Sequence, residues 1–200
     1  MTNEDILNGR LTRDEKEERL RQRARTIWMT GLSGAGKTTI ALALERELFK
    51  QGFFVQLLDG DDVRNNLNKD LSFSPEDRTE NIRRIAEVNR LFNNSAVITI
   101  NCFISPTNEI RDMAREIIGA GNFIEVYIKA SLEVCEKRDV KGLYAKARAG
   151  LIKDFTGIGA PYDVPQNPDL ILETANESPD ESARKAIEFI LPRITWNANN

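Results

Sequence analysis

The 200-residue sequence contains no histidine and only two cysteines. Without an imidazole, catalytic triads built on histidine are excluded, and any general base must be a carboxylate, lysine, tyrosine or cysteine. Cys102 and Cys135 lie in apolar surroundings without metal-ligand spacing, which favours two buried thiols in a reducing compartment. No apolar run reaches the roughly 18 residues of a membrane span, and the N-terminus has no signal-peptide pattern. We therefore expect a cytoplasmic protein that does not bind a membrane.

An excess of either charge is also absent, because the net charge is only −3 and the two signs are interspersed. This argues against nonspecific nucleic-acid binding but leaves room for a local basic pocket. The length fits one domain with a real core. We expect a charged N-terminal extension over residues 1–25, the domain over 26–195 and a C-terminal tail over 196–200. Residues 12–25 show little apolar periodicity and predict a solvated arm, with self-association as the less favoured alternative.

Short apolar runs alternate with amphipathic stretches from residue 26 onward. Strands are predicted at 26–31, 53–58, 96–103, 123–128 and 169–174, and helices at 37–51, 75–94, 108–118, 132–138 and 180–191. Strands that alternate with helices predict an α/β fold, in which a mostly parallel sheet is covered by helices on both faces.

The stretch GLSGAGKT at residues 31–38 matches G-x-x-x-x-G-K-[ST] between a predicted strand and a predicted helix. Its glycines allow backbone N–H groups to surround phosphate oxygens, and the helix N-terminus adds a positive dipole end. Lys37 should contact the β and γ phosphates, and the Thr38 hydroxyl should bind Mg²⁺. The alternative, a glycine-rich turn that binds nothing, is disfavoured by the agreement of motif and context. We predict a three-layer P-loop NTPase fold whose ATP site contains Gly31, Leu32, Ser33, Gly34, Ala35, Gly36, Lys37, Thr38 and Thr39.

Three carboxylates, Asp59, Asp61 and Asp62, follow the apolar run at 53–58. Carboxylates this close repel one another unless a metal, a proton or a helix N-terminus lies nearby. In small-molecule kinases a carboxylate here can accept the proton of the acceptor hydroxyl or fix the magnesium shell. We assign these roles to Asp61, supported by Asp59. A helix N-cap is the alternative role, which we expect for Asp62.

Residues 139–161 form a long, charged segment with several glycines. Connections of this length in a compact domain are usually functional lids or disordered. A kinase must keep water from the γ-phosphoryl group, so we expect a mobile lid that closes over bound nucleotides.

Five separated segments together make residues 26 to about 194 closely resemble the adenylylsulfate kinase (APS kinase) family. They are IWMTGLSGAGKTT, LDGDDVRNNLNKDLSFSPEDRTENIRRIAEV, FISP, IEVYIKASLEVCEKRDVKGLYAKARAG and FTGIGAPYDVPQNPDL. The resemblance implies transfer of the ATP γ-phosphoryl group to the 3′-hydroxyl of adenosine 5′-phosphosulfate. The products are 3′-phosphoadenylylsulfate (PAPS) and ADP, in sulfate activation and assimilation. It also implies Mg²⁺ as cofactor, a homodimer and a possible association with an ATP sulfurylase.

The resemblance also implies site residues. Catalytic roles fall to Asp61, Lys37 and Ser105, and metal binding to Thr38 and Asp61. Arg138 and Arg148 are placed near the donor nucleotide. The implied acceptor-binding residues are Asp59, Asp61, Arg64, Phe73, Arg78, Asn81, Ile104, Ser105, Lys141, Leu143 and Phe155.

General chemistry agrees with these assignments. Two phenylalanine faces, here Phe73 and Phe155, hold a planar base well, and arginine forks such as Arg64 and Arg78 suit phosphate and sulfate oxygens. Core packing is the alternative for Phe73, and a simple backbone cap is the alternative for Ser105, a position described in some family members as phosphorylated.

Two other functions compete with this prediction. One is a related P-loop kinase for another small acceptor, such as a nucleoside monophosphate or a sugar acid. The other is a nucleotide-binding regulatory module that has lost catalysis, which the retention of Lys37, Thr38, Asp61 and Arg64 disfavours. Asn65-Asn66 and Thr107 depart from the common family pattern and leave the acceptor affinity open.

Overall fold

A computed structural model describes residues 9–197. Its five strands pair in parallel in the order β2-β3-β1-β4-β5. The chain order does not follow the sheet order, so crossover helices cover both faces. The strands are β1 (Thr26–Thr30), β2 (Val55–Asp59), β3 (Ile98–Cys102), β4 (Phe123–Lys129) and β5 (Leu170–Glu173).

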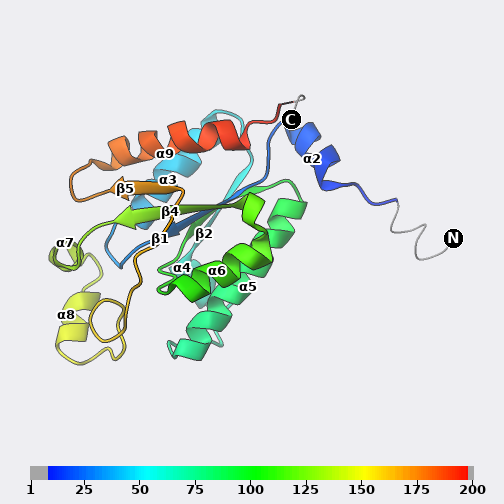
Figure 1. Cartoon of the computed structure of the whole chain (residues 1–200). Coiled ribbons are helices and arrows are strands. Elements are labelled where there is room, and N and C mark those ends of the chain that lie inside the picture. Colours follow the sequence, from blue (N-terminus) through cyan, green and yellow to red (C-terminus); the bar gives the residue numbers. More distant parts are fainter. Residues whose placement is uncertain (1–8, 198–200) are drawn as a thin grey trace.

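Helices lie on both sides of the sheet, with α3 and α9 on one face and α5 and α6 on the other (Figure 1). Each pair of helices buries an apolar stripe against the sheet, so there are two cores. The first includes Leu44 and Ile190, and the second includes Trp28 and Ile85. The helices are α2 (Arg13–Leu20), α3 (Lys37–Lys50), α4 (Gly60–Asn65), α5 (Pro75–Asn94), α6 (Asn108–Ile118), α7 (Leu132–Arg138), α8 (Leu143–Arg148) and α9 (Pro179–Ile194).

The α/β prediction is confirmed, and every predicted strand and helix from residue 26 onward is present with ends shifted by a few residues. Two short α-helices and the 3-10 helix η1 (Ala120–Asn122) were not predicted within the described residues. Of the two α-helices, one is α4, which begins inside the carboxylate cluster, and the other is α8, which lies inside the segment 139–161. Both cysteines are buried free thiols, as expected. Among residues 9–197, no helix has the length and apolar character needed to cross a bilayer.

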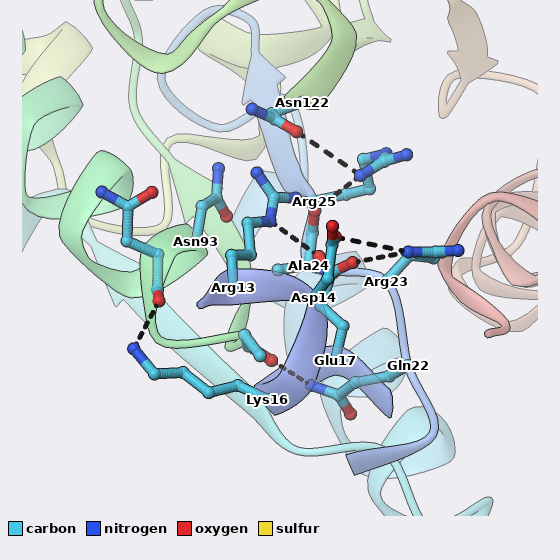
Figure 2. Close-up of polar contacts among 12 residues, drawn as sticks. Arg13, Asp14, Lys16, Glu17, Gln22, Arg23, Ala24, Arg25, Asn93 and Asn122 are labelled. Atoms are coloured by element: carbon cyan, nitrogen blue, oxygen red, sulfur yellow. Dashed lines mark hydrogen bonds and ion pairs between the residues drawn. The ribbon is translucent and has the colours of Figure 1, made fainter. Parts of the chain in front are cut away.

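Helix α2 lies at the end of the domain opposite α7 and α8 (Figure 1), and most of its side chains are exposed, as expected of a solvated arm. Glu17 within it and Gln22 and Ala24 after it are buried, which the sequence did not predict. The Glu17 carboxylate is buried and accepts hydrogen bonds from Arg13 Nε at 2.7 Å, Arg23 Nη1 at 3.0 Å and the backbone N–H of Ala24 at 2.8 Å. Figure 2 shows Arg23 directed at Glu17, and Arg13 at Ala24. This buried carboxylate is a structural anchor that joins α2 to the segment leading into β1.

Gln22 extends this anchor to the amino ends of the strands. Its side chain is fully buried and behaves like an added peptide group. The amide nitrogen donates to the carbonyls of Ala96 at 2.7 Å and Phe54 at 3.0 Å, and the amide oxygen accepts from the Phe54 N–H at 2.8 Å. Three backbone groups at the start of the sheet are thereby satisfied away from water. The opposite, carboxyl end of the sheet is left open for the site.

Candidate active site

We call the GLSGAGKT stretch, residues 31–38, the phosphate loop. It lies at the carboxyl end of β1 and leads into α3. Gly31 is required there, because a Cβ at this position would lie 2.6 Å from the carbonyl oxygen of Ile128. Gly36 caps α3 with a left-handed φ of 106°. The following Lys37 donates from Nζ to the carbonyls of Gly31 at 2.8 Å and Leu32 at 2.9 Å. Burial lowers the pKa of Lys37 to about 8, a shift that nearby thiols and Asp59 only partly oppose.

The carboxylate cluster meets the phosphate loop through Asp59. Its Oδ2 accepts a hydrogen bond from Thr38 Oγ1 at 2.8 Å, and its Oδ1 accepts from the backbone N–H of Asp61 at 3.0 Å. Asp59 is therefore the N-cap of α4, and the expectation that Asp62 fills this role is wrong. One carboxylate thus holds both the predicted metal-binding hydroxyl of Thr38 and the backbone of Asp61.

Asp61 points its own carboxylate toward the segment 139–161, where it forms an ion pair with Lys141. Both side chains are more than half exposed, at 65% for Asp61 and 58% for Lys141. An ion pair this exposed contributes at most about 1 kcal/mol. A ligand can therefore separate the two charges at little cost.

We call residues 139–161 the lid. Asp139, which precedes helix α8 in the lid, satisfies backbone N–H groups in the first turn of that helix. Its two carboxylate oxygens each accept one hydrogen bond at 3.0 Å, from the N–H groups of Tyr144 and Ala145. The Tyr144 hydroxyl donates to the Ser33 carbonyl at 2.9 Å. The bond to Ser33 attaches the lid directly to the phosphate loop.

Phe73 and Phe155, the two side chains predicted to hold a planar base and called here the aromatic walls, lie on different loops. Phe73 is 63% exposed, which excludes the core-packing alternative. The guanidinium carbon of Arg64 lies 4.4 Å from the centre of its ring. Phe155, on the lid, is half-buried and meets the ring of Tyr144 edge-on, with ring centroids 5.0 Å apart.

Arg64 and Arg78 lie close enough to affect each other. Burial lowers the pKa of Arg64, and the charge of Arg78 lowers it further, while the carboxylate of Asp77 opposes only part of the shift. Two neighbouring guanidinium groups repel each other unless an anion lies between them or beside them. This pair therefore favours phosphate or sulfate in the same region as the aromatic walls.

Ser105 is held from both sides in the loop after β3. Its hydroxyl is buried and accepts a hydrogen bond from the indole N–H of Trp28 at 3.0 Å. Its backbone is left-handed, with a φ of 40°, and its carbonyl accepts from Arg111 Nη1 at 2.7 Å. Arg111 is itself buried and paired with Glu125 at 2.9 Å. Sequence reasoning missed Trp28 and Arg111, because each reads as an ordinary strand or helix residue.

The two predicted donor-side arginines differ. Arg138 lies against the phosphate loop and donates to the carbonyls of Gly34 at 3.2 Å and Ala35 at 3.3 Å. Arg148 instead pairs with Glu136 at 2.8 and 3.0 Å and does not line the cavity, so the structure does not place it at the donor site.

Asn81, predicted on the acceptor side, is buried and accepts a hydrogen bond from the Asn68 amide at 3.0 Å.

One cavity of about 840 Å³ connects these parts. That volume is at the upper end of the range for small-molecule sites. It runs from the phosphate loop past the carboxylates to the aromatic walls. The predicted site residues that line it are Ser33, Gly34, Ala35, Gly36, Lys37, Thr38, Thr39, Asp59, Asp61, Arg64, Phe73, Arg78, Asn81, Ile104, Ser105, Arg138, Lys141, Leu143 and Phe155.

Comparison with known proteins gives a consistent result. Residues 23–173 match the family model described as adenylylsulphate kinase. The chain is 56% identical over 189 residues to the adenylyl-sulfate kinase of Bacteroides thetaiotaomicron, which covers 94% of each chain. It is 59% identical over 169 residues to that of Halothermothrix orenii, covering 84% of this chain and 90% of the relative. Among solved structures, the Mycobacterium tuberculosis APS kinase CysC in complex with AMPPNP and APS superposes with a TM-score of 0.81 at 46% identity, covering 84% of this chain and 98% of that one.

Proposed function

The chain belongs to the adenylylsulphate kinase family, and from this premise we propose how its cavity works. The enzyme transfers the γ-phosphoryl group of ATP to the 3′-hydroxyl of adenylylsulfate, which gives 3′-phosphoadenylylsulfate and ADP. The observation that carries the proposal is the continuity of one cavity from the phosphate loop to the two aromatic walls. Donor and acceptor can therefore lie in line within a single cleft, as phosphoryl transfer requires.

On the donor side, phosphate oxygens of the bound triphosphate replace the loop carbonyls as hydrogen-bond acceptors of the Lys37 ammonium group. The ammonium group exchanges its bonds to Gly31 and Leu32 for the β- and γ-phosphate oxygens. The exchange favours the protonated lysine, because a phosphate charge opposes the burial that lowers its pKa. Arg138 keeps the carbonyls of the loop turned away from the phosphates.

Mg²⁺ fits the oxygen donors beside the loop. The Thr38 hydroxyl already lies 2.8 Å from an oxygen of Asp59, the N-cap of α4, and Asp61 lies in the first turn of α4. Hydroxyl and carboxylate oxygens are the ligands that this ion prefers, usually together with substrate phosphates. Within the described residues no cluster of three or more acidic or cysteine side chains could hold a metal alone, which agrees with sharing between protein and nucleotide. When bound, the ion supplies positive charge to the β and γ phosphates.

On the acceptor side, the adenine stacks between Phe73 and Phe155, and Arg64 and Arg78 bind the phosphosulfate. Asp61 accepts the proton of the 3′-hydroxyl as that oxygen attacks the γ-phosphorus. For this to happen Asp61 must leave Lys141, and the exposure of both side chains keeps the cost of that exchange small. Closure of the lid removes water that would otherwise compete with the hydroxyl.

Ser105 acts by position in this proposal. Because its hydroxyl is buried and accepts the Trp28 indole N–H, it is not presented as a free nucleophile or phosphate carrier. The bond from Arg111 to the Ser105 carbonyl holds the left-handed loop that lines the cavity. The serine thus fixes the floor of the acceptor site.

The test is a coupled ADP-release assay with ATP and a panel of acceptors: adenylylsulfate, AMP and gluconate. We expect turnover with adenylylsulfate only, and formation of 3′-phosphoadenylylsulfate checked by mass. Turnover with AMP or gluconate in place of adenylylsulfate would identify a different small-molecule kinase. No turnover with any acceptor, in a protein that still binds ATP, would favour a regulatory module.

The cellular setting follows from the same chemistry. Adenylylsulfate is a mixed anhydride of phosphate and sulfate, so a reaction that joins sulfate to an adenylyl group must supply it. We therefore place the enzyme after an ATP sulfurylase, in cytoplasmic sulfate assimilation leading to PAPS, where the two buried thiols stay reduced.

We also propose that the enzyme is a homodimer. Light scattering coupled to gel filtration would test it, and the mass of one chain would reject it.

A further inference from the structure

One arginine connects the two loops that carry the aromatic walls. Arg78 on α5 donates from Nε to the carbonyl of Phe73 at 2.9 Å. The same guanidinium donates from Nη2 to the carbonyl of Asp154 at 2.6 Å and from Nη1 to Thr156 Oγ1 at 2.7 Å. Its contacts are therefore Phe73 itself on one side and the two neighbours of Phe155 on the other.

Thr156 is built to hold its hydroxyl in place. The side chain is buried, and the residue pairs with Ala160 across a tight turn. The turn is closed by the carbonyl of Phe155, which accepts backbone N–H bonds from Gly159 at 3.0 Å and Ala160 at 3.1 Å. The turn fixes the backbone of Thr156, and burial restricts its side chain. It is the only side-chain group among the three acceptors of Arg78, and no role follows for it from the motifs in the sequence.

Asp154 adds a second sign of constraint. Its φ of 53° is left-handed, a conformation that residues other than glycine adopt rarely. Such a backbone persists where its surroundings fix it. Here the carbonyl of Asp154 is fixed by Arg78 on one side of Phe155, and Thr156 is fixed by the same group on the other.

We propose that Arg78 and Thr156 form a strap that sets the separation between Phe73 and Phe155, and that Thr156 is a positioning residue for acceptor binding. The inference rests on the proposed function, since it concerns the slot for the acceptor's base. Stacking on two faces requires one fixed gap between them, and a gap that varies loses affinity through the cost of ordering both loops. A planar guanidinium suits this task because its N–H groups point in fixed directions.

The strap leaves Arg78 able to bind an anion as well. A guanidinium has five N–H donors, and the three contacts above use one each. Two donors remain for a phosphate or sulfate oxygen. Arg64 differs, because its guanidinium covers one face of the Phe73 ring in this structure and has to move if the base stacks on that face. The strap holds the Phe73 loop in position during that exchange.

The test compares Thr156→Val, which keeps the shape and removes the hydroxyl, with Thr156→Ser, which keeps the hydroxyl. We expect Thr156→Val to raise the KM for adenylylsulfate about tenfold, the usual size for loss of a hydrogen bond to a charged group, and to leave the KM for ATP unchanged. Thr156→Ser should stay within about threefold of the wild type on the same scale. An equal rise in both variants would show that the hydroxyl is not the determinant, and a rise in Thr156→Ser alone would assign the effect to the methyl group. Either result would overturn the strap.

A second readout does not depend on turnover. Lys153 is exposed and directly precedes Asp154, so the rate of tryptic cleavage after Lys153 reports how firmly this part of the lid is held. Without ligand, Thr156→Val should be cleaved several-fold faster than the wild type and Thr156→Ser should not. Equal cleavage rates in all three proteins would overturn the proposal. Wild-type protein that fails to turn over adenylylsulfate would instead overturn the proposed function, and the cleavage result would still stand.

Discussion

Replacing Phe73 with alanine tests the acceptor slot directly, because this side chain is 63% exposed and supports the fold little. Stacking of one base on an aromatic ring contributes about 1–3 kcal/mol. Part of this is offset, since the free ring already holds Arg64 at 4.4 Å in a cation–π contact worth about 0.5–1 kcal/mol at an exposed site. The net loss should be about 1–2 kcal/mol, or roughly a 5–30-fold rise in the KM for adenylylsulfate.

The assay is ADP release at varied adenylylsulfate and at varied ATP, with the same enzyme preparation. The KM for ATP should not change, because Phe73 lies on the loop before α5 and the phosphate loop lies at the end of β1. Phe49→Ala is the matched control, since Phe49 is 70% exposed at the end of α3 and does not line the cavity. An unchanged KM for adenylylsulfate in Phe73→Ala would refute the stacking argument. A parallel rise for both substrates would mean that the loop as a whole has moved.

Three further changes have defined outcomes. Because burial holds the pKa of Lys37 at about 8 and phosphate binds its protonated form, calorimetric affinity for ATP should fall as pH rises past that value; a flat profile from pH ~7 to ~9 would contradict the assignment. Burial raises the pKa of Glu17 but its hydrogen bonds lower it more, so its stabilisation exists above pH 4.5 and is lost as pH falls. Glu17→Gln should therefore lower the urea-unfolding free energy by about 1–3 kcal/mol at neutral pH and by much less below pH ~4, whereas a constant difference would exclude the ionic anchor. Asp59→Asn keeps the α4 cap, and it should raise several-fold the Mg²⁺ concentration needed for half-maximal ATP binding; an unchanged requirement would remove Asp59 from the metal site.

The local signals in the sequence were sufficient for the framework. GLSGAGKT needs only its own glycines and a strand and helix on either side, and the structure has both. The apolar periods of the strands and longer helices are likewise short-range patterns. The sequence left Phe73 open between core packing and base stacking, and its exposure excludes core packing.

The sequence could not predict the contacts of individual side chains with residues that lie far away in the chain. Glu17 reads as one more charge in a charged stretch, because the burial of its carboxylate depends on how the whole arm packs. The hydroxyl of Ser105 meets Trp28, which is 77 residues earlier, and that contact exists only once β1 and β3 pair. Arg148 could equally have faced the cavity or Glu136, since both choices satisfy a guanidinium on a short helix.

Asp61→Asn most directly tests whether this carboxylate serves the acceptor hydroxyl. The measurement is kcat with saturating ATP and adenylylsulfate, set beside the calorimetric Kd for ATP with Mg²⁺ in the same protein. If Asp61 takes the proton of the 3′-hydroxyl, kcat falls by about 10²–10⁴-fold while the Kd changes little. Equal losses in kcat and in ATP affinity would contradict this, because Asp61 would then act through the metal or the fold alone and not on the acceptor hydroxyl.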